Sequence, residues 1–256
     1  MTPTPATVLA RRVAAEGTGT ALLLLAVAGS GTMAAQIAPG SAAVALFALS
    51  IAAGGTLLAL ALAFGKLSGG HFNPAISVAA ALMRVLSWRD AMCYMAAQII
   101  GAFVGVAAAF LLFGDPLVLI SADSRSGVGL SRSELVATFG LVAIYCGCAR
   151  ARPAVWPFAL AGYVAAVYWF SAAPTLANPA IAIARAGMYV PSQIPWAWLG
   201  LCLAVQAFGT AACAGISRWL FEDDVPRPER ADDAQNEIRR RAETPELHTQ
   251  VERVAA

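Results

Sequence analysis

An Asn-Pro-Ala motif occurs twice in the chain, at residues 73–75 and at residues 178–180. The first copy ends the run Ser-Gly-Gly-His-Phe-Asn-Pro-Ala, the second ends Pro-Thr-Leu-Ala-Asn-Pro-Ala, and each precedes a short apolar stretch. Asn is favoured at the N-cap of a helix, and Pro at the first helical position, because its missing N–H would lack an intrahelical partner anyway. Each copy therefore predicts a short helix that begins at its Asn and follows an irregular loop.

The composition places these loops in a membrane. The chain is 59% hydrophobic and only 12% charged, whereas soluble domains carry roughly 25% charged residues. Irregular backbone survives within a bilayer only where it is buried in protein or lines a cavity. Two interrupted helices at matching places in two halves point to a solute site near the midplane. The sequence thus predicts an all-α, multi-pass membrane protein.

Apolar runs of about 20 residues, the length of one membrane span, divide the chain further. The expected spans cover residues 13–36, 42–64, 91–113, 134–148, 156–172 and 196–220, and the expected half-helices cover 73–86 and 178–188. A re-entrant loop is expected at residues 66–72. We expect an N-terminal cytoplasmic segment (1–10), a first repeat (11–113), an extracellular connector (114–131), a second repeat (132–220) and a charged, disordered cytoplasmic tail (221–256).

Further matches support an internal repeat. Glu16 and Glu134 each stand at the front of an apolar run, and Gln98 and Gln206 occupy corresponding places in the third span of each half. Three spans per half require the second copy to be inserted upside down. Such an inverted repeat brings the two half-helix N-termini face to face near the bilayer centre.

The distribution of Arg and Lys predicts the orientation. With the N-terminus inside, eight basic residues fall in cytoplasmic segments: Arg11, Arg12, Lys66, Arg84, Arg89, Arg150, Arg152 and Arg218. Only Arg125, Arg132 and Arg185 fall outside. This bias predicts that both termini are cytoplasmic. It serves membrane orientation and does not indicate nucleic-acid binding.

The half-helices also predict the chemistry of the pore. Each N-terminus carries roughly half a positive charge, so two ends that meet at the midplane oppose cations and protons but not neutral molecules. Because an N-cap uses the side-chain oxygen, we expect the amide NH₂ groups of Asn73 and Asn178 to be free to donate to a passing solute. Loop carbonyls supply acceptors around Gly70, His71, Thr175 and Leu176.

Glu16 and Glu134 are the only acids deep within the expected spans, where ionisable groups suggest function. One interpretation is that each carboxylate accepts hydrogen bonds from its re-entrant loop. The other is that they relay protons in a coupled secondary transporter. His71 stands alone among apolar neighbours, and the sequence contains no nucleophile–base pair and no phosphate loop, so we expect no metal site, no cofactor and no enzymatic activity.

The paired motifs, each between hydrophobic spans, resemble those of the major intrinsic proteins, the aquaporins and aquaglyceroporins. The resemblance covers about residues 10–220. It implies a bundle of six transmembrane helices plus two re-entrant half-helices, and a passive channel for small neutral solutes. It also implies a homotetramer in membrane lipid with one pore per subunit, in which Glu16 and Glu134 support the loops.

The sequence departs from that family at the outer constriction. In water-selective members an Arg directly follows the second motif, and here Ile181 has that place. A gapless alignment from the two motifs puts Ala53, Ala166 and Thr175 at the other filter positions. Four small or apolar side chains predict a wide, apolar opening for water, glycerol-like solutes, and metalloid hydroxides or methylated arsenicals. Residues 178–185 resemble a bacterial subgroup linked to arsenic handling.

Two alternatives stay open for the function, a water-selective aquaporin and a coupled secondary transporter. Two also stay open for Arg185, seven residues after Asn178 and therefore on nearly the same helix face. Its guanidinium could reach back over Ile181 toward the outer vestibule, since helical side chains lean toward the N-terminus. Alternatively, it extends to the outer lipid headgroups as a surface residue.

Overall fold

The computed structural model describes residues 4–114, 128–172, 176–187 and 196–220, and these residues contain helices and connections but no strand. The chain divides into two compact units, residues 1–217 and 218–256. The second unit contributes only the last three residues of the final helix to the described structure. The six longer helices are α1 (Pro5–Ile37), α2 (Ala42–Ser68), α4 (Trp88–Phe113), α5 (Val128–Ala151), α6 (Trp156–Phe170) and α8 (Trp196–Leu220). The two short helices are α3 (Pro74–Leu82) and α7 (Pro179–Gly187).

The lengths of the helices agree with a membrane bundle. Five of the described helices, α1, α2, α4, α5 and α8, are long and apolar enough to cross a membrane. The sixth, α6, has 15 residues and rises about 22 Å, less than the roughly 30 Å thickness of a hydrocarbon core. It ends at Phe170, and the N–H of the C-cap residue Ser171 still bonds to the Val167 carbonyl.

Several expected helix ends are wrong. The first helix begins at Pro5 instead of Val13, because the Thr4 hydroxyl accepts a hydrogen bond from Thr7 N–H and caps it. The second continues to Ser68 and takes in the first three residues of the expected loop, and the C-cap residue Gly69, with a φ of 95°, terminates it.

Two further ends differ from expectation. The first half-helix ends at Leu82 instead of Leu86, because Arg84 adopts a φ of 60° and left-handed backbone cannot continue a right-handed helix. Val128 begins α5 inside the segment expected to be an extracellular connector.

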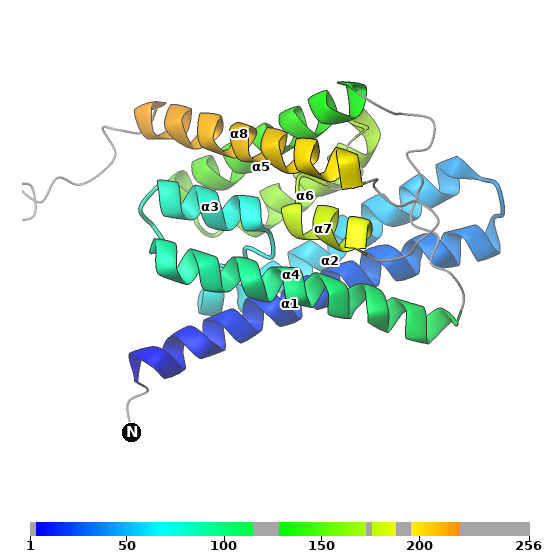
Figure 1. Cartoon of the computed structure of the whole chain (residues 1–256), viewed down its shortest axis with the longest axis horizontal. Helices are drawn as coiled ribbons and strands as arrows, with labels where there is room; N and C mark the ends of the chain where they lie inside the picture. The colour runs from blue at the N-terminus through cyan, green and yellow to red at the C-terminus, as the bar shows by residue number, and fades with distance from the viewer. Residues whose placement is uncertain (1–3, 115–127, 173–175, 188–195, 221–256) are drawn as a thin grey trace, which may run out of the picture. The chain divides into compact units, whose positions relative to one another are not determined.

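Small residues allow the long helices to approach closely within residues 1–217. The first helix packs along α4 and α2, and α2 packs against α6. At the crossing of α1 and α4, a Cβ added to Gly101 would collide with the Gly17 carbonyl. The short helices α3 and α7 contact each other and α4, and they lie between the longer helices (Figure 1).

Candidate pore site

Both Asn residues of the repeated motif cap their short helices. The Asn73 side-chain oxygen accepts a hydrogen bond from Ala75 N–H at 2.8 Å, and that of Asn178 accepts one from Ala180 N–H at 3.0 Å. These caps fix the direction of α3 and α7, because an N-cap satisfies backbone N–H groups that have no partner within the helix. The N-termini of α3 and α7 therefore lie at the amide side chains of Asn73 and Asn178.

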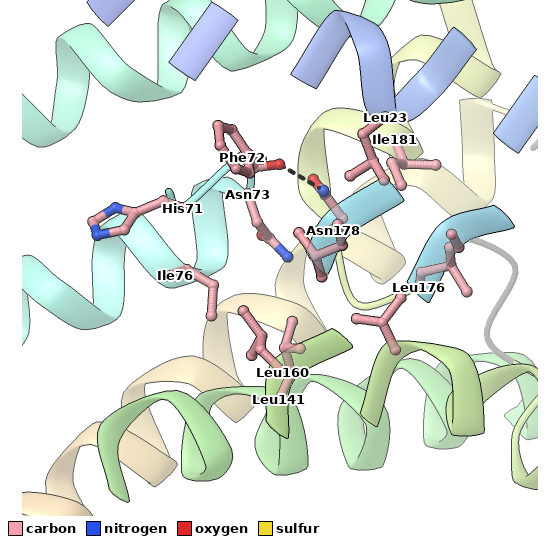
Figure 2. A pocket seen from close by; sticks show the side chains of 13 residues that line it. Leu23, His71, Phe72, Asn73, Ile76, Leu141, Leu160, Leu176, Asn178 and Ile181 are labelled. Carbon is pink, nitrogen blue, oxygen red and sulfur yellow. Dashed lines mark hydrogen bonds between the residues drawn. The ribbon is translucent and has the colours of Figure 1, made fainter. Parts of the chain in front are cut away.

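The amide NH₂ groups are not free, in contrast to the expectation from sequence. Asn73 Nδ2 donates to the Ala177 carbonyl at 3.0 Å, and Asn178 Nδ2 donates to the Phe72 carbonyl at 3.0 Å. Figure 2 shows the second of these bonds as a dashed line. Each amide has two N–H groups, so the cross-links leave one N–H on each Asn without a partner among the described residues.

Left-handed backbone turns the two loops toward each other. Phe72 and Ala177, the residues directly before the two Asn, have φ angles of 47° and 57°, and Leu176 has 55°. Such backbone costs roughly 1–2 kcal/mol per non-glycine residue and persists only where the surroundings enforce it. Two of these residues, Phe72 and Ala177, carry the carbonyls that accept the Asn cross-links. The third, Leu176, precedes Ala177 in the same loop.

Glu16 holds the first loop from the α1 side. Its fully buried carboxylate accepts hydrogen bonds from the N–H groups of His71 at 2.9 Å and Phe72 at 2.6 Å. The Ser68 hydroxyl and Gln98 Nε2 donate to the same carboxylate at 2.6 and 2.8 Å. One carboxylate thereby joins α1, the loop and α4.

Glu134 occupies the corresponding place in the second repeat. Its side chain is fully buried, and Gln206 Nε2 donates to its carboxylate at 2.9 Å. The matched pair Gln98 and Gln206 therefore binds the matched pair Glu16 and Glu134. The part of the second loop at residues 173–175 lies outside the described residues.

His71 belongs to an aromatic cluster that sequence reasoning missed. Its Nδ1 lies 3.1 Å from the Ser77 hydroxyl, and its Nε2 lies 3.1 Å from the Tyr145 hydroxyl. The rings of Tyr94 and Tyr145 approach it edge-on, with centroids at 5.5 and 5.6 Å. The two tyrosines come from distant parts of the chain and carry no local signal that links them to the motif.

A cavity lies beside the Asn amides, which form part of its lining. Figure 2 shows Leu141 and Leu160 along one side of it and the two Asn side chains between the loops. Three of the thirteen lining side chains are polar, His71, Asn73 and Asn178. The apolar lining residues are Leu23, Ala53, Leu57, Phe72, Ile76, Leu141, Leu160, Val164, Leu176 and Ile181.

Comparison with known proteins identifies the family. A model of the family described as Major intrinsic protein matches residues 5–198 of this chain. The chain belongs to the major intrinsic protein family. The paired half-helices of this family correspond in this chain to α3 and α7, which begin directly after Asn73 and Asn178.

Individual relatives agree with this assignment. This major intrinsic protein is 41% identical to Aquaglyceroporin AqpS of Rhizobium meliloti (strain 1021) over 219 residues, or 85% of this chain and 93% of that one. It is 30% identical to Aquaporin-4 of Homo sapiens over 178 residues, or 63% and 52%. The X-ray structure of the aquaglyceroporin from Plasmodium falciparum superposes with a TM-score of 0.68 at 18% identity, covering 87% of this chain and 99% of that one. The aquaporin-like, all-α fold class is thereby confirmed.

The four expected filter residues of this major intrinsic protein have different positions. Ala53 and Ile181 line the cavity, whereas Thr175 lies outside the described residues. Ala166 is exposed and stands about 200° around α6 from the cavity-lining Val164. The gapless alignment is therefore wrong at this position, because it assumed a fixed spacing between α6 and Asn178.

Arg185 is not a surface residue. Its side chain is only 7% exposed, so the interpretation that it extends to the lipid headgroups is wrong. The last turns of α7 are covered because Ala182 and Ala186 pack against Leu199 of α8.

Proposed function

We propose that the protein is a passive transmembrane channel for small uncharged solutes, including water and glycerol-like molecules. The observation that carries this proposal is the cavity at the junction of two half-helices, lined by the two cross-linked Asn amides. The similarity to an aquaglyceroporin and to an aquaporin supports a channel rather than an enzyme.

The electrostatics of the junction explain why charged species are opposed. Two helix N-termini direct positive partial charge toward one place, and a cation there would lose its hydration shell without gaining a negative ligand. A neutral solute meets no such barrier. The remaining N–H of each Asn amide can donate to its oxygen and replace part of its hydration.

The outer constriction is proposed to be wide and apolar. Ala53 and Ile181 line the cavity from opposite repeats, and neither can donate or accept a side-chain hydrogen bond. Such a gate admits solutes larger than water. Metalloid hydroxides or methylated arsenicals are the finer proposal, supported by the resemblance of residues 178–185 to a subgroup linked to arsenic handling.

Two rival functions are distinguishable. A water-selective channel would need a narrow, hydrogen-bonding gate, which Ala53 and Ile181 do not supply. A coupled transporter would need an ionisable group that can exchange protons, whereas Glu16 is fully buried and engaged by four donors. These contacts favour the interpretation of Glu16 as a support of the loop, and we propose the same role for Glu134.

Stopped-flow measurements on proteoliposomes test the proposal. We expect protein-dependent flux of water, glycerol, urea and arsenite that does not saturate and does not require an ion gradient. Protein-free vesicles of the same lipid are the control, and a protonophore removes any proton gradient. Flux that stops with the protonophore would assign the protein to the coupled carriers instead.

Arg185 is proposed to place a positive charge near the outer vestibule. Replacement by Leu should lower the flux of a partly ionised methylated arsenical relative to glycerol by about tenfold or more, because one charge at roughly 10 Å contributes about 1.7 kcal/mol at an effective dielectric constant of 20. Arg132, which is exposed at the start of α5, provides the matched Arg→Leu control. Equal changes for both solutes would show that Arg185 acts only on stability.

The assembly and location are proposed on the family resemblance. The chain is expected to form a homotetramer with one pore per subunit, in a bacterial inner membrane, with both termini in the cytoplasm. Native mass measurement in mild detergent would decide the oligomeric state, and monomers alone would contradict the tetramer.

A further inference from the structure

We propose that this channel prefers amphipathic solutes with few hydroxyl groups on one edge, such as short diols, over polyols with the same carbon skeleton. The inference deepens the proposed channel function and rests on it. It comes from the hydrogen-bonding inventory of the cavity, which is polar along the two loops and apolar on every other side.

The cavity's polar side chains offer donors but are short of acceptors. The side-chain oxygens of Asn73 and Asn178 already accept backbone N–H groups, while one N–H of each amide has no partner among the described residues. Both ring nitrogens of His71 are engaged, by Ser77 and Tyr145. A solute oxygen can therefore accept from an Asn amide, but its own hydroxyl proton finds no free side-chain acceptor there.

The walls away from the loops come from four long helices and are entirely apolar. These wall residues are Leu23 of α1, Ala53 and Leu57 of α2, Leu141 of α5, and Leu160 and Val164 of α6. On the opposite side, the backbone carbonyls of the two loops are the remaining acceptors for a solute hydroxyl. A hydroxyl that faces the aliphatic walls loses its water and gains nothing in return, which is costly for a polar group.

Glycerol and propane-1,2-diol form a matched pair for this arrangement. They share three carbons and differ by one hydroxyl, which a hydrogen replaces in the diol. The diol can turn both hydroxyls toward the loops and its methyl group toward the wall. Glycerol must either crowd three hydroxyls along the edge formed by the loops or bury one hydroxyl without a hydrogen-bond partner. One such hydroxyl lowers the occupancy of the cavity by glycerol about tenfold.

Stopped-flow flux through proteoliposomes of the purified full-length protein tests the preference, after subtraction of the flux through protein-free vesicles. We expect the protein-dependent permeability of propane-1,2-diol to exceed that of glycerol by about tenfold. Equal permeabilities, or a faster passage of glycerol, overturn the preference while leaving the channel intact. If neither solute passes faster than through bare lipid, the proposed channel function fails and the preference falls with it.

A variant on the apolar wall tests the cause. Val164→Thr puts a hydroxyl in the cavity at nearly constant volume, and a helical Thr can donate to the carbonyl four residues earlier, so its oxygen stays available as an acceptor. We expect glycerol permeability to rise severalfold while that of the diol stays unchanged. Val167→Thr is the matched control, since Val167 is a buried residue of the same helix that does not line the cavity.

The control separates the wall from general effects of a new hydroxyl. Val167→Thr should keep the wild-type ratio of the two permeabilities. If both variants change the ratio equally, or if Val164→Thr leaves it unchanged in a folded protein, the apolar wall does not set the preference. Should Val164→Thr fail to fold, the ratio measured on the unmodified protein still decides the proposal.

Discussion

Glu16 connects three separate parts of the chain through one carboxylate. It receives hydrogen bonds from the loop N–H groups of His71 and Phe72, from Ser68 at the end of α2, and from Gln98 of α4. Phe72 in turn presents its carbonyl to Asn178 in the other repeat. A buried acid in α1 thereby helps to fix the position of an amide in the pore, 162 residues further along the chain (178 − 16).

Replacement of Glu16 by Gln should destabilise the protein and reduce solute flux. In Gln an NH₂ group replaces one of the two carboxylate oxygens. Because each of these oxygens accepts one loop N–H, at least one buried N–H loses its partner. We expect the free energy of unfolding in detergent to fall by about 2 kcal/mol or more, measured by circular dichroism. Glycerol flux into proteoliposomes should fall in the same variant.

Asp90→Asn serves as the control for this prediction. Asp90 forms a partly exposed ion pair with Arg12 at 3.4 Å, and such pairs contribute about 0–1 kcal/mol. It should therefore change the stability little and leave the flux intact. A Glu16→Gln protein that is as stable as the original but has lost only gradient-driven uptake would instead identify Glu16 as a coupling residue.

At the scale of the helices, the contact between α1 and α4 depends on glycine. A Cβ at Gly101 would strike the Gly17 carbonyl, whereas one at Gly162 of α6 would meet no atom within 4 Å. The same substitution can therefore be made at a tight crossing and at an open site.

Gly101→Ala should destabilise the protein, and Gly162→Ala should stabilise it slightly. Overpacking costs about 1–3 kcal/mol, while Ala in an open helical position gains up to about 1 kcal/mol over Gly. Thermal unfolding of both variants in the same detergent checks the opposite signs. Two variants of equal stability would mean that the helices separate at Gly101 without cost.

At the same scale, we propose that two elements, α2 and α7, form the outer constriction. An aromatic at Ala53 together with Arg at Ile181 should narrow it, because both residues line the cavity. We expect the variant Ala53→Phe with Ile181→Arg to lose most glycerol flux and retain water flux in the stopped-flow assay.

Ala166 provides the control for the narrowed constriction. It is exposed on the far side of α6 from the cavity, so Ala166→Phe with Ile181→Arg should retain more glycerol flux than the variant that carries Phe at position 53. If the Phe at position 166 blocks glycerol as strongly, the gapless alignment was right and the cavity does not define the constriction.

Across the whole molecule, local signals were predictable and contacts between distant segments were not. Caps and apolar runs placed both half-helix starts, because Asn73 and Asn178 act on their own next residues. The bonds from each Asn to the opposite loop were missed, since they require knowledge that the loops meet. The bond of Tyr145 to His71 was missed for the same reason. Counting back from Asn178 misplaced the α6 filter residue, because spacing within a loop is not fixed by its sequence.

The orientation that we expect for the molecule in the membrane rests on one basic end. Arg12 of α1 bonds to Asp90 of α4, so the N-terminal ends of these two helices lie together, beside Arg89. Lys66 lies in the last turn of α2, a helix that packs on α1. Positively charged ends stay in the cytoplasm, so this end is expected to face inward.

Protease-sensitive tags test that orientation directly. Gly40 is exposed in the turn between α1 and α2 and has open space around it. A tag inserted after Gly40 should be cut by protease added to intact spheroplasts. A tag after Ala154, exposed in the turn between α5 and α6, should be protected until the membrane is opened, because it lies at the basic end beside Arg152. The reverse pattern would place both termini outside, and cleavage of both tags in intact cells would mean that the inserted population has no single orientation.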